Sequence, residues 1–413
     1  MPGPYTYFDP EEALDLLRPH LIRLEAEEVP LAEANGRVLA TALEARLDQP
    51  RFRKAAVDGF ALLPGQGTEP FISTATVAAG DPRKPEEPSN LKEGEALRIM
   101  TGAVVPPDVE RVVRIEYTEK LETGAYRVVT QERQTNIAEP GENIRAGDPL
   151  LSQRFLTPLD VGILASQGYA QVSVVRRPRV IVISTGTELY YPDAPELPPW
   201  GIYDSNSYQL TALSETHLAR VENRGILGDD QERITEALRS ALDEADVLIC
   251  SGGVSMGDLD FVPAALQEIG ATVHFHGLAV KPGKPTLFAT HQGRLVFGLP
   301  GNPVSTAAQF EFFIAPALRA LQGLHYTPRE ALLPLAEPFR RTNADRHEYL
   351  PGNYRDGQIR RINYRGSGHL SALADADLLF RIDRGVSELA RGEQVYARFI
   401  RPNNRLSSDL GNR

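Results

Sequence analysis

The sequence predicts a multidomain α/β protein with a central doubly wound parallel sheet, an N-terminal α+β region carrying a β-rich subdomain, and a small C-terminal β domain. Between about residues 177 and 325, hydrophobic runs alternate with helix-like stretches, as in a parallel sheet covered by helices. On either side, short β-branched runs are punctuated by Pro and Gly, which is typical of small β domains. At 413 residues, the chain is also too long for one hydrophobic core.

The N-terminal region is predicted to span residues 1–176. Acidic residues near the start of Pro10–Leu17 favour a helix there, because the helix dipole stabilises negative charge at that end. We expect further helices over Leu31–Ala40 and 158–168, and then a strand over Gln171–Val175. The inserted β-rich subdomain is placed at about 50–145, where the short runs are Ile72–Val77, Ala96–Ile99, Arg111–Tyr117 and Arg127–Val129.

The α/β domain is predicted over residues 177–325, and the C-terminal β domain over 326–405. Strands of the α/β domain are expected at Val180–Ser184, about Leu218–Val221, Val247–Cys250, Thr272–Phe275 and Leu295–Phe297. Its helices are expected at Asn206–Leu213, Glu232–Ala241, Phe261–Ile269 and Val304–Leu318. The strands of the C-terminal domain are expected at Ala331–Ala336, Glu348–Leu350, Gln358–Arg361, Leu378–Ile382 and Gln394–Phe399.

Composition narrows the function classes. The net charge of −11 argues against a general nucleic-acid binder, which needs a basic face, but a local cationic cleft can still attract an anion. The sequence shows neither a secretory signal nor an apolar run long enough for a membrane span, so we expect a cytoplasmic protein. The single cysteine, Cys250, excludes an internal disulfide and a cysteine-based metal cluster, and the histidines have no metal-ligand spacing.

Three glycine-containing turns follow hydrophobic runs of the α/β domain. They are Thr185–Glu188, Ser251–Asp258 and Gly298–Pro303. In an open parallel sheet such turns emerge at the carboxyl ends of the strands, where ligands bind. Amide groups at the helix starts beyond them favour an anionic, phosphorylated ligand.

The turn Ser251–Asp258 is the most specific of these patterns. The spacing from Gly252 to Gly257 is similar to the start of a P-loop, but Asp258 stands where that motif needs Lys, and the dinucleotide-binding glycine pattern is absent. The turn still offers exposed amides, the hydroxyls of Ser251 and Ser255, and a carboxylate that can hold Mg²⁺ beside a phosphate. The structural alternative is a tight turn with Asp258 as a helix cap.

Lysine is rare in this chain, yet two of its six lysines, Lys281 and Lys284, lie within four residues. The intervening Pro282 and Gly283, with Pro285 beyond, restrict the backbone, so two like charges are held close together. A solvated surface pair does not need that rigidity. We therefore expect the pair to bind an anion.

The remaining candidates are ambiguous taken singly. Glu188 is a candidate metal ligand or base beside the first turn, and Pro300 and Asn302 are equally well explained as a helix start and its cap. Asp58 and Thr101 each lie beside a glycine in the N-terminal half, where a structural role is the simpler interpretation.

Taken together and in order, these stretches resemble the molybdopterin molybdenumtransferase family, which inserts molybdate in the last step of molybdenum cofactor synthesis. The resemblance runs from about residue 10 to 400. The matching residues are Val57–Ala61, Ile99–Ala103, Gly141–Arg145, Ser184–Leu189, Asp204–Asn206, Ser251–Asp258, Val280–Pro285, Gly298–Pro303 and Gly366–Ser371.

The resemblance implies an elongated homodimer whose active site lies between the α/β domain of one subunit and the β-rich subdomain of the other. It implies that adenylylated molybdopterin, molybdate and Mg²⁺ yield the cofactor and AMP, and that the adenylyltransferase of the preceding step is a candidate partner. The catalytic residues would be Asp58, Thr101, Glu188, Lys281 and Lys284, and Asp258, Asp58 and Glu188 would hold the metal. The substrate-binding residues would be Ser251, Gly252, Gly253, Ser255, Gly257, Pro300, Asn302, Arg346 and Ser371.

One segment departs from the family pattern. Arg145 runs at once into Ala146-Gly147-Asp148-Pro149, where relatives have a longer segment with a further Gly and Asp. Asp148 either replaces that carboxylate or only lies near it. Because this edge of the site differs from the family pattern, the oxyanion could be tungstate instead of molybdate. Two rival functions also remain open: the adenylyltransferase of the preceding step, and a non-catalytic pterin-binding scaffold.

Overall fold

The computed structural model describes residues 7–255, 257 and 260–401. The chain forms two compact units. One comprises the described residues of Met1–Glu27, Gly36–Val38 and Val174–Arg413, and the other comprises Glu28–Asn35 and Leu39–Ser173. No helix among the described residues is both long and apolar enough to cross a membrane.

A six-stranded sheet forms the centre of the first unit in the described part of the chain, with the order β17-β14-β18-β22-β21-β19. Their bounds are β14 Arg179–Thr185, β17 Arg220–Leu227, β18 Val247–Ser251, β19 Thr272–His276, β21 Leu287–His291 and β22 Arg294–Leu299. Neighbouring strands from β17 to β22 are parallel, whereas β21 is antiparallel to both β22 and β19. The expectation of a wholly parallel sheet is therefore wrong for β21, a strand that the sequence interpretation did not include.

The reversal at β21 has a local cause. Residues His291 and Arg294 pair across a two-residue turn, Gln292-Gly293, in which both residues have positive φ (48° and 80°). Such turns match the twist of antiparallel strands. The short connection cannot hold the crossover that a parallel neighbour needs.

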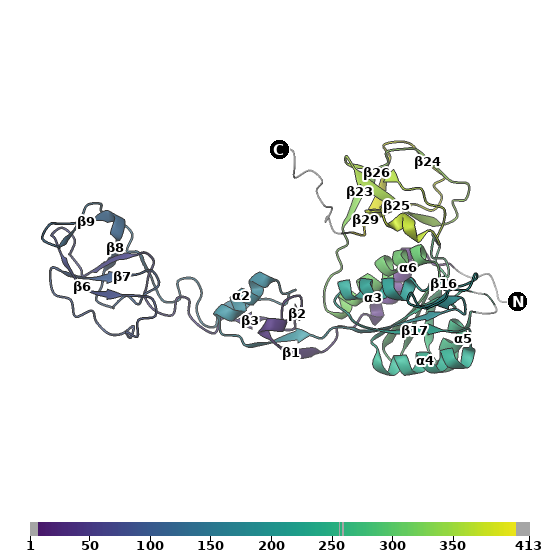
Figure 1. The fold of residues 1–413 in the computed structure, drawn as a ribbon, viewed down its shortest axis with the longest axis horizontal. Coiled ribbons are helices and arrows are strands. Elements are labelled where there is room, and N and C mark those ends of the chain that lie inside the picture. Colours follow the sequence, from purple (N-terminus) through teal and green to yellow (C-terminus); the bar gives the residue numbers. More distant parts are fainter. Residues whose placement is uncertain (1–6, 256, 258–259, 402–413) are drawn as a thin grey trace. The chain divides into compact units, whose positions relative to one another are not determined.

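Helices cover both faces of the sheet, as expected for a doubly wound domain (Figure 1). Helices α4 (Gln231–Glu244) and α5 (Phe261–Ile269) pack on one face, and α3 (Asn206–Thr216), α6 (Pro303–Gln309) and α7 (Ala315–Leu321) pack on the other. Strand β18 serves both cores because its side chains alternate: Val247 and Ile249 face the second group of helices, and Leu248 and Cys250 face the first. A π-helical segment, Phe310–Ile314, joins α6 to α7, so the helix predicted over Val304–Leu318 is not regular throughout.

The C-terminal β domain is part of the same unit. Its described sheet has the order β20-β25-β27-β29-β23, with β26 also paired to β25. The bounds are β20 Val280–Lys281, β23 Glu330–Pro334, β25 His347–Arg355, β26 Gln358–Arg361, β27 Leu378–Ile382 and β29 Gln394–Phe399. Strand β20 comes from the α/β domain and places Lys281 opposite Glu348. This pairing joins the lysine turn to the β domain.

The second unit contains the expected β-rich subdomain. Its four-stranded sheet, counted over the described residues, has the order β6-β7-β5-β8. The bounds are β5 Gly59–Leu62, β6 Ile72–Val77, β7 Glu95–Ile99 and β8 Arg111–Arg114. Phe60 and Ala61 of β5 lie in two separate cores, because successive side chains point to opposite faces of the strand.

Two helix predictions near the N-terminus have different outcomes. Helix α1 (Pro10–Leu17) is confirmed and begins with a capping box between Asp9 and Glu12. The helix predicted over Leu31–Ala40 is wrong: only a 3-10 turn, Leu31–Glu33, forms, and strand β2 (Val38–Leu39) follows. Gly36 adopts a left-handed φ of 75° between them, which ends the helical turn.

Candidate functional site

The three glycine-containing turns meet at the carboxyl edge of the central sheet. Gly252 has a φ of 87°, and its amide donates a hydrogen bond of 3.0 Å to the carbonyl of Leu299. A Cβ on Gly252 would lie 2.3 Å from the carbonyl oxygen of Thr185, and one on Gly253 would lie 2.5 Å from the Thr185 hydroxyl. A Cβ on Gly301 would lie 3.8 Å from the Cα of Gly252. The turns thus pack so closely that the middle one requires glycine.

Buried polar side chains support this edge. The Asn206 amide nitrogen donates to the Ser251 hydroxyl at 2.8 Å and to the Gly301 carbonyl at 2.7 Å. Asp204 Oδ1 accepts from the Ser184 hydroxyl at 3.2 Å. Asp204 and Asn206 belong to one of the stretches that resemble the family, but nothing in their local sequence marks them as site residues.

Three polar atoms at this edge are buried and have no hydrogen-bond partner among the described residues. They are Thr185 Oγ1, Asp204 Oδ2 and Asn206 Oδ1. A buried polar group without a partner costs about 1–3 kcal/mol, so a protein rarely keeps several together without a ligand. Their grouping beside the glycine turns indicates that a polar ligand completes this edge.

The outer part of the second turn is only partly described. Ser255 is exposed, and the amide of Gly257 donates to Asp260 Oδ2 at 2.8 Å. Asp258, which was expected to hold a metal, lies outside the described residues. Its role therefore stays a prediction.

Carboxylates flank the first turn. Glu188 is exposed just beyond β14, and Asp229 Oδ2 accepts hydrogen bonds from the Thr187 amide and hydroxyl at 3.2 and 3.0 Å. Asp229 was not selected from the sequence. The described residues contain no group of three or more His, Cys, Asp or Glu side chains that could hold a metal. Oxygen ligands from a phosphorylated substrate would complete a Mg²⁺ site here, as is usual for that ion.

Buried residues hold the turn that carries the two lysines. The Gln309 side-chain amide donates to the Pro282 carbonyl at 3.2 Å, and the Thr286 hydroxyl donates to the Gly283 carbonyl at 2.7 Å. Gly283 has a φ of 111°, and a Cβ there would lie 2.2 Å from Gln309 Nε2. This support restricts the backbone between the two ammonium groups.

The lysines take different neighbours. Lys281 Nζ lies 2.8 Å from Glu348 Oε1, and Lys284 Nζ lies 4.5 Å from the centre of the Tyr7 ring. Lys281 keeps 59% of its side-chain surface exposed despite its ion pair. Both lysines line the same pocket and are available to a further anion.

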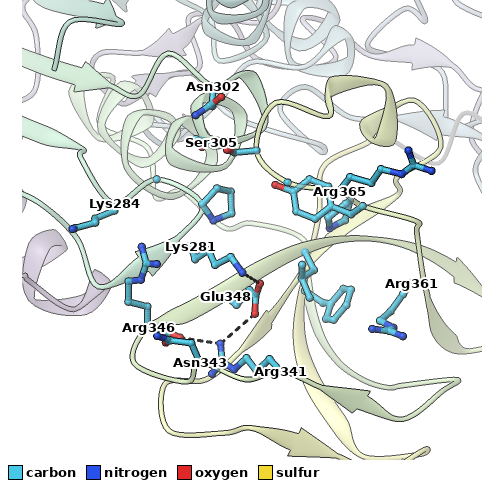
Figure 2. Close-up of a pocket in the computed structure, with 18 of the residues that line it drawn as sticks. Lys281, Lys284, Asn302, Ser305, Arg341, Asn343, Arg346, Glu348, Arg361 and Arg365 are labelled. Atoms are coloured by element: carbon cyan, nitrogen blue, oxygen red, sulfur yellow. Dashed lines mark hydrogen bonds and ion pairs between the residues drawn. The ribbon is translucent and has the colours of Figure 1, made fainter. Parts of the chain in front are cut away.

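This pocket has a volume of about 910 Å³ and lies between the α/β domain and the C-terminal β domain (Figure 2). Of the described charged residues that line it, one is acidic, Glu348, and the others are cationic: Lys281, Lys284, Arg340, Arg341, Arg346, Arg361 and Arg365. Pro300 and Asn302 of the third glycine turn also line it. A strongly cationic pocket in a protein of net charge −11 focuses anions locally.

The structure brings five of the predicted residues into this pocket: Lys281, Lys284, Pro300, Asn302 and Arg346. Ser371 does not line it. Instead, Ser371 lies on a 3-10 turn, Leu370–Leu373, and lines a neighbouring hollow of about 980 Å³ that also includes Arg365. Arg341 and Arg365 were missed because nothing in their local sequence distinguishes them from surface arginines.

Asp58 and Thr101 lie together in the second unit. Asp58 Oδ1 accepts hydrogen bonds of 2.7 Å from both the amide and the hydroxyl of Thr101. These bonds lower the pKa of Asp58, the backbone bond having the larger effect. Asp58 is exposed, so its carboxylate can reach a ligand. Asp148 of the shortened segment instead accepts from the Arg145 amide at 2.9 Å and closes a turn.

Family comparisons cover most of the chain. Residues 8–168 match the "MoeA N-terminal region (domain I and II)", residues 181–320 match the "Probable molybdopterin binding domain", and residues 333–398 match the "MoeA C-terminal region (domain IV)". Two crystal structures of molybdopterin biosynthesis MoeA proteins from Pyrococcus horikoshii align with TM-scores of 0.81 and 0.75. Each is 29% identical in sequence, and they cover 96% and 95% of this chain and all of their own.

Curated relatives agree with these matches. A molybdopterin molybdenumtransferase from Nostoc sp. is 36% identical over 315 residues, which is 73% of this chain and 70% of the relative. The enzymes of the same name from Bacillus subtilis and Haemophilus influenzae are each 32% identical, covering 92% and 90% of this chain and 91% and 93% of their own lengths. The chain therefore belongs to the molybdopterin molybdenumtransferase family.

Proposed function

We propose that this protein transfers molybdate to adenylylated molybdopterin and releases AMP. The observation that carries the proposal is the cationic pocket beside the third glycine turn. Two residues of that turn, Pro300 and Asn302, line the pocket. The residue between them, Gly301, packs against Gly252 of the second turn. An oxyanion in the pocket and a phosphate at the glycine edge would thus be neighbours.

The proposed roles follow from the chemistry of the two regions. Lys281, Lys284 and Arg346 neutralise the oxyanion, because ammonium and guanidinium groups donate to any anionic oxygen. The unpaired oxygens of Asp204 and Asn206 only accept hydrogen bonds, so they bind donor groups of the substrate. Amides of the second turn and the Thr185 hydroxyl donate to its phosphate end. Such preorganised donors contribute most where negative charge develops during transfer.

Mg²⁺ would be held by Glu188, by Asp58 and by Asp258, which lies outside the described residues. When bound, the ion polarises the phosphoanhydride that is broken. Asp58 and Thr101 reach the reaction centre, in this proposal, from the other subunit of a homodimer. The adenylyltransferase of the preceding step is the proposed partner that supplies the substrate.

Single-turnover release of AMP from adenylylated molybdopterin, with molybdate and Mg²⁺, tests the proposal. We expect Lys281→Ala and Asp58→Ala each to slow release by about a hundredfold, the loss typical of removing one group that stabilises the transition state. Lys84→Ala, in an exposed loop of the second unit, is the matched control and should release AMP at the parent rate.

Three results would contradict the proposed activity or its site. Parent rates in both site variants would show that the reaction occurs elsewhere. Consumption of ATP with unmodified molybdopterin would instead indicate an adenylyltransferase. Tight substrate binding without AMP release would indicate a scaffold. Repeating the reaction with tungstate establishes which oxyanion the protein prefers.

A further inference from the structure

Arg98 lies beside the Asp58–Thr101 pair of the second unit. It is near the end of β7, and the turn after β7 carries Thr101, which donates two hydrogen bonds to Asp58. The residue after Arg98, Ile99, is paired with Gly59, the residue after Asp58. Strand pairing therefore brings this arginine and the carboxylate to the same end of the sheet.

The side chain of Arg98 forms no hydrogen bond or ion pair with any residue that the structure describes. It is partly buried, and its Nε atom is shielded from solvent without a partner. Leaving a buried donor unpaired costs free energy, so a protein usually pairs such a group with its own chain or with a ligand. The other arginines of this sheet have partners: Arg111 Nη2 donates to the Gln66 carbonyl at 2.7 Å, and Arg114 Nε lies 3.5 Å from Glu132 Oε1.

Arg98 and Asp58 interact through their charges without forming an ion pair in the described structure. The pKa of Asp58 is lowered first by the backbone and side-chain hydrogen bonds from Thr101, and then by the positive charge of Arg98. A cation and a carboxylate separated in this way can contact one ligand together. The carboxylate then holds a metal ion, and the guanidinium donates to an anionic oxygen bound to that ion.

Neutralising Asp58 is not a sufficient explanation for Arg98. Asp58 is exposed, so water solvates its carboxylate, and Thr101 already supplies two donors. A guanidinium whose only role was to neutralise this carboxylate would be most stable in a direct, bidentate pair with it. The donors of Arg98 instead remain available to a third group.

We propose that Arg98 is a further substrate-binding residue, which donates hydrogen bonds to an anionic oxygen of the reactants beside Asp58. The inference rests on the proposed function, because it assumes that Asp58 faces the reaction centre. The oxygen belongs either to the phosphate of adenylylated molybdopterin or to molybdate. Both carry negative charge and accept hydrogen bonds from a guanidinium group, so the chemistry of recognition is the same.

The concentration dependence of AMP release in Arg98→Gln tests the proposal and separates the two sources. In single turnovers of the full-length protein, one reactant is varied while the other is saturating. We expect the half-saturating concentration of one reactant to rise about tenfold, the loss typical of a hydrogen bond to a charged group. A rise for adenylylated molybdopterin assigns the phosphate, a rise for molybdate assigns the oxyanion, and an equal rise for both places Arg98 between them.

Arg111→Gln is the matched control. Arg111 is a partly buried arginine of the same sheet, paired in register with Leu62 at the far end of β5 from Asp58, and its Nε is also unpaired. This variant loses the hydrogen bond to the Gln66 carbonyl, so its denaturation midpoint should fall while both half-saturating concentrations stay at the parent values. Arg98→Gln should show the opposite pattern, with an unchanged midpoint and weaker binding.

The outcomes separate this inference from the proposed function. Parent rates in Asp58→Ala would remove Asp58 from the reaction centre and would overturn both. Slow release in Asp58→Ala, with parent half-saturating concentrations of both reactants in folded Arg98→Gln, would overturn the role of Arg98 alone. A lower denaturation midpoint in Arg98→Gln without any change in binding would give Arg98 a structural role instead.

Discussion

At the scale of single residues, hydrogen bonds decide which charge a side chain presents to a ligand. Asp58 is exposed, yet two hydrogen bonds from Thr101 stabilise its ionised form and lower its pKa. The carboxylate therefore stays negative to lower pH than a free aspartate. That state is needed by a metal ligand, and equally by a group that orients an attacking oxygen.

Thr101→Val tests this coupling. The variant loses the hydroxyl donor but keeps the backbone amide, so the pKa of Asp58 should rise toward its ordinary value. Because the proposed role of Asp58 requires its ionised form, the acidic limb of the AMP-release profile should move to higher pH, with little change at neutral pH. Thr118→Val, whose hydroxyl donates to the Ile115 carbonyl, is the control. An acidic limb that does not move would show that Asp58 does not set it.

At the scale of elements, close packing of turns sets which residues the site tolerates. Gly252 combines a left-handed φ with a backbone neighbour, Thr185, where a side chain would be. Gly270, at the end of α5, has a similar φ of 82° but open space around it. Substituting alanine at each glycine therefore separates the free-energy cost of a left-handed backbone from the cost of a steric clash.

Gly252→Ala and Gly270→Ala therefore form a matched pair. Gly270→Ala should lower the free energy of unfolding by about 1–2 kcal/mol, the cost of a left-handed alanine. Gly252→Ala should cost more than about 3 kcal/mol, because backbone must also move, and it should weaken AMP binding. Denaturant unfolding and AMP titration measure both effects. Equal costs would mean that the turns do not pack as described.

The amino ends of the central strands are joined by a buried ion-pair network. Arg176 donates to both oxygens of Asp246, one at 2.8 Å, and also pairs with Glu25. Burial acts to raise the pKa of Asp246, but hydrogen bonds from Arg176 and from the Arg179 amide outweigh it and lower the pKa. The network thus stabilises the edge opposite the site.

Asp246→Asn should lower the free energy of unfolding by about 3 kcal/mol at neutral pH, since it removes the buried carboxylate and leaves Arg176 with only the exposed Glu25 as an ion-pair partner. The folded-state pKa of Asp246 is lowered, so its stabilisation is present above the unfolded-state pKa and is lost as pH falls through the folded-state value. The difference between variant and parent should therefore shrink in acid. Asp356→Asn, in an exposed pair with Arg360, should change little at any pH.

At the scale of the whole molecule, the candidate residues are divided between two compact units. Lys281 and its pocket belong to one unit, and Asp58 with Thr101 belongs to the other. The family resemblance implies that a complete site takes one part from each subunit of a homodimer. Complementation between inactive subunits tests that arrangement directly.

Lys281→Ala and Asp58→Ala proteins, each expected to be about a hundredfold slower alone, should regain activity when they are unfolded together and refolded as a mixture. Half of the dimers then carry both variants, and one of their two sites is intact, so about a quarter of parental activity is expected. Mixing Lys281→Ala with Lys284→Ala is the control, because both changes lie in one pocket and no intact site can form. Recovery in neither mixture would place the complete site within one subunit.

Local sequence patterns were sufficient for much of this architecture. The bounds of α5, β26 and β27 agree with the expectation, because each segment carries its own periodicity and its own terminating residues. The glycine turns and the lysine pair can be recognised for the same reason, because the Gly and Pro residues that set their backbone conformation are adjacent in the sequence. The helix prediction over Leu31–Ala40 fails because Gly36 adopts a left-handed φ and β2 then pairs with a distant strand, Gln171–Val175, which no local pattern reveals.

The composition of the pocket depends instead on contacts between residues that are far apart in the sequence. Glu348 meets Lys281 only because β20 pairs with β25, and Arg341 and Arg365 enter the pocket from separate segments of the C-terminal domain. A lone glutamate or arginine has no local pattern that distinguishes a pocket from a surface. Its charge acquires a function only through the neighbours that folding brings within a few ångströms, and those neighbours lie far away along the chain.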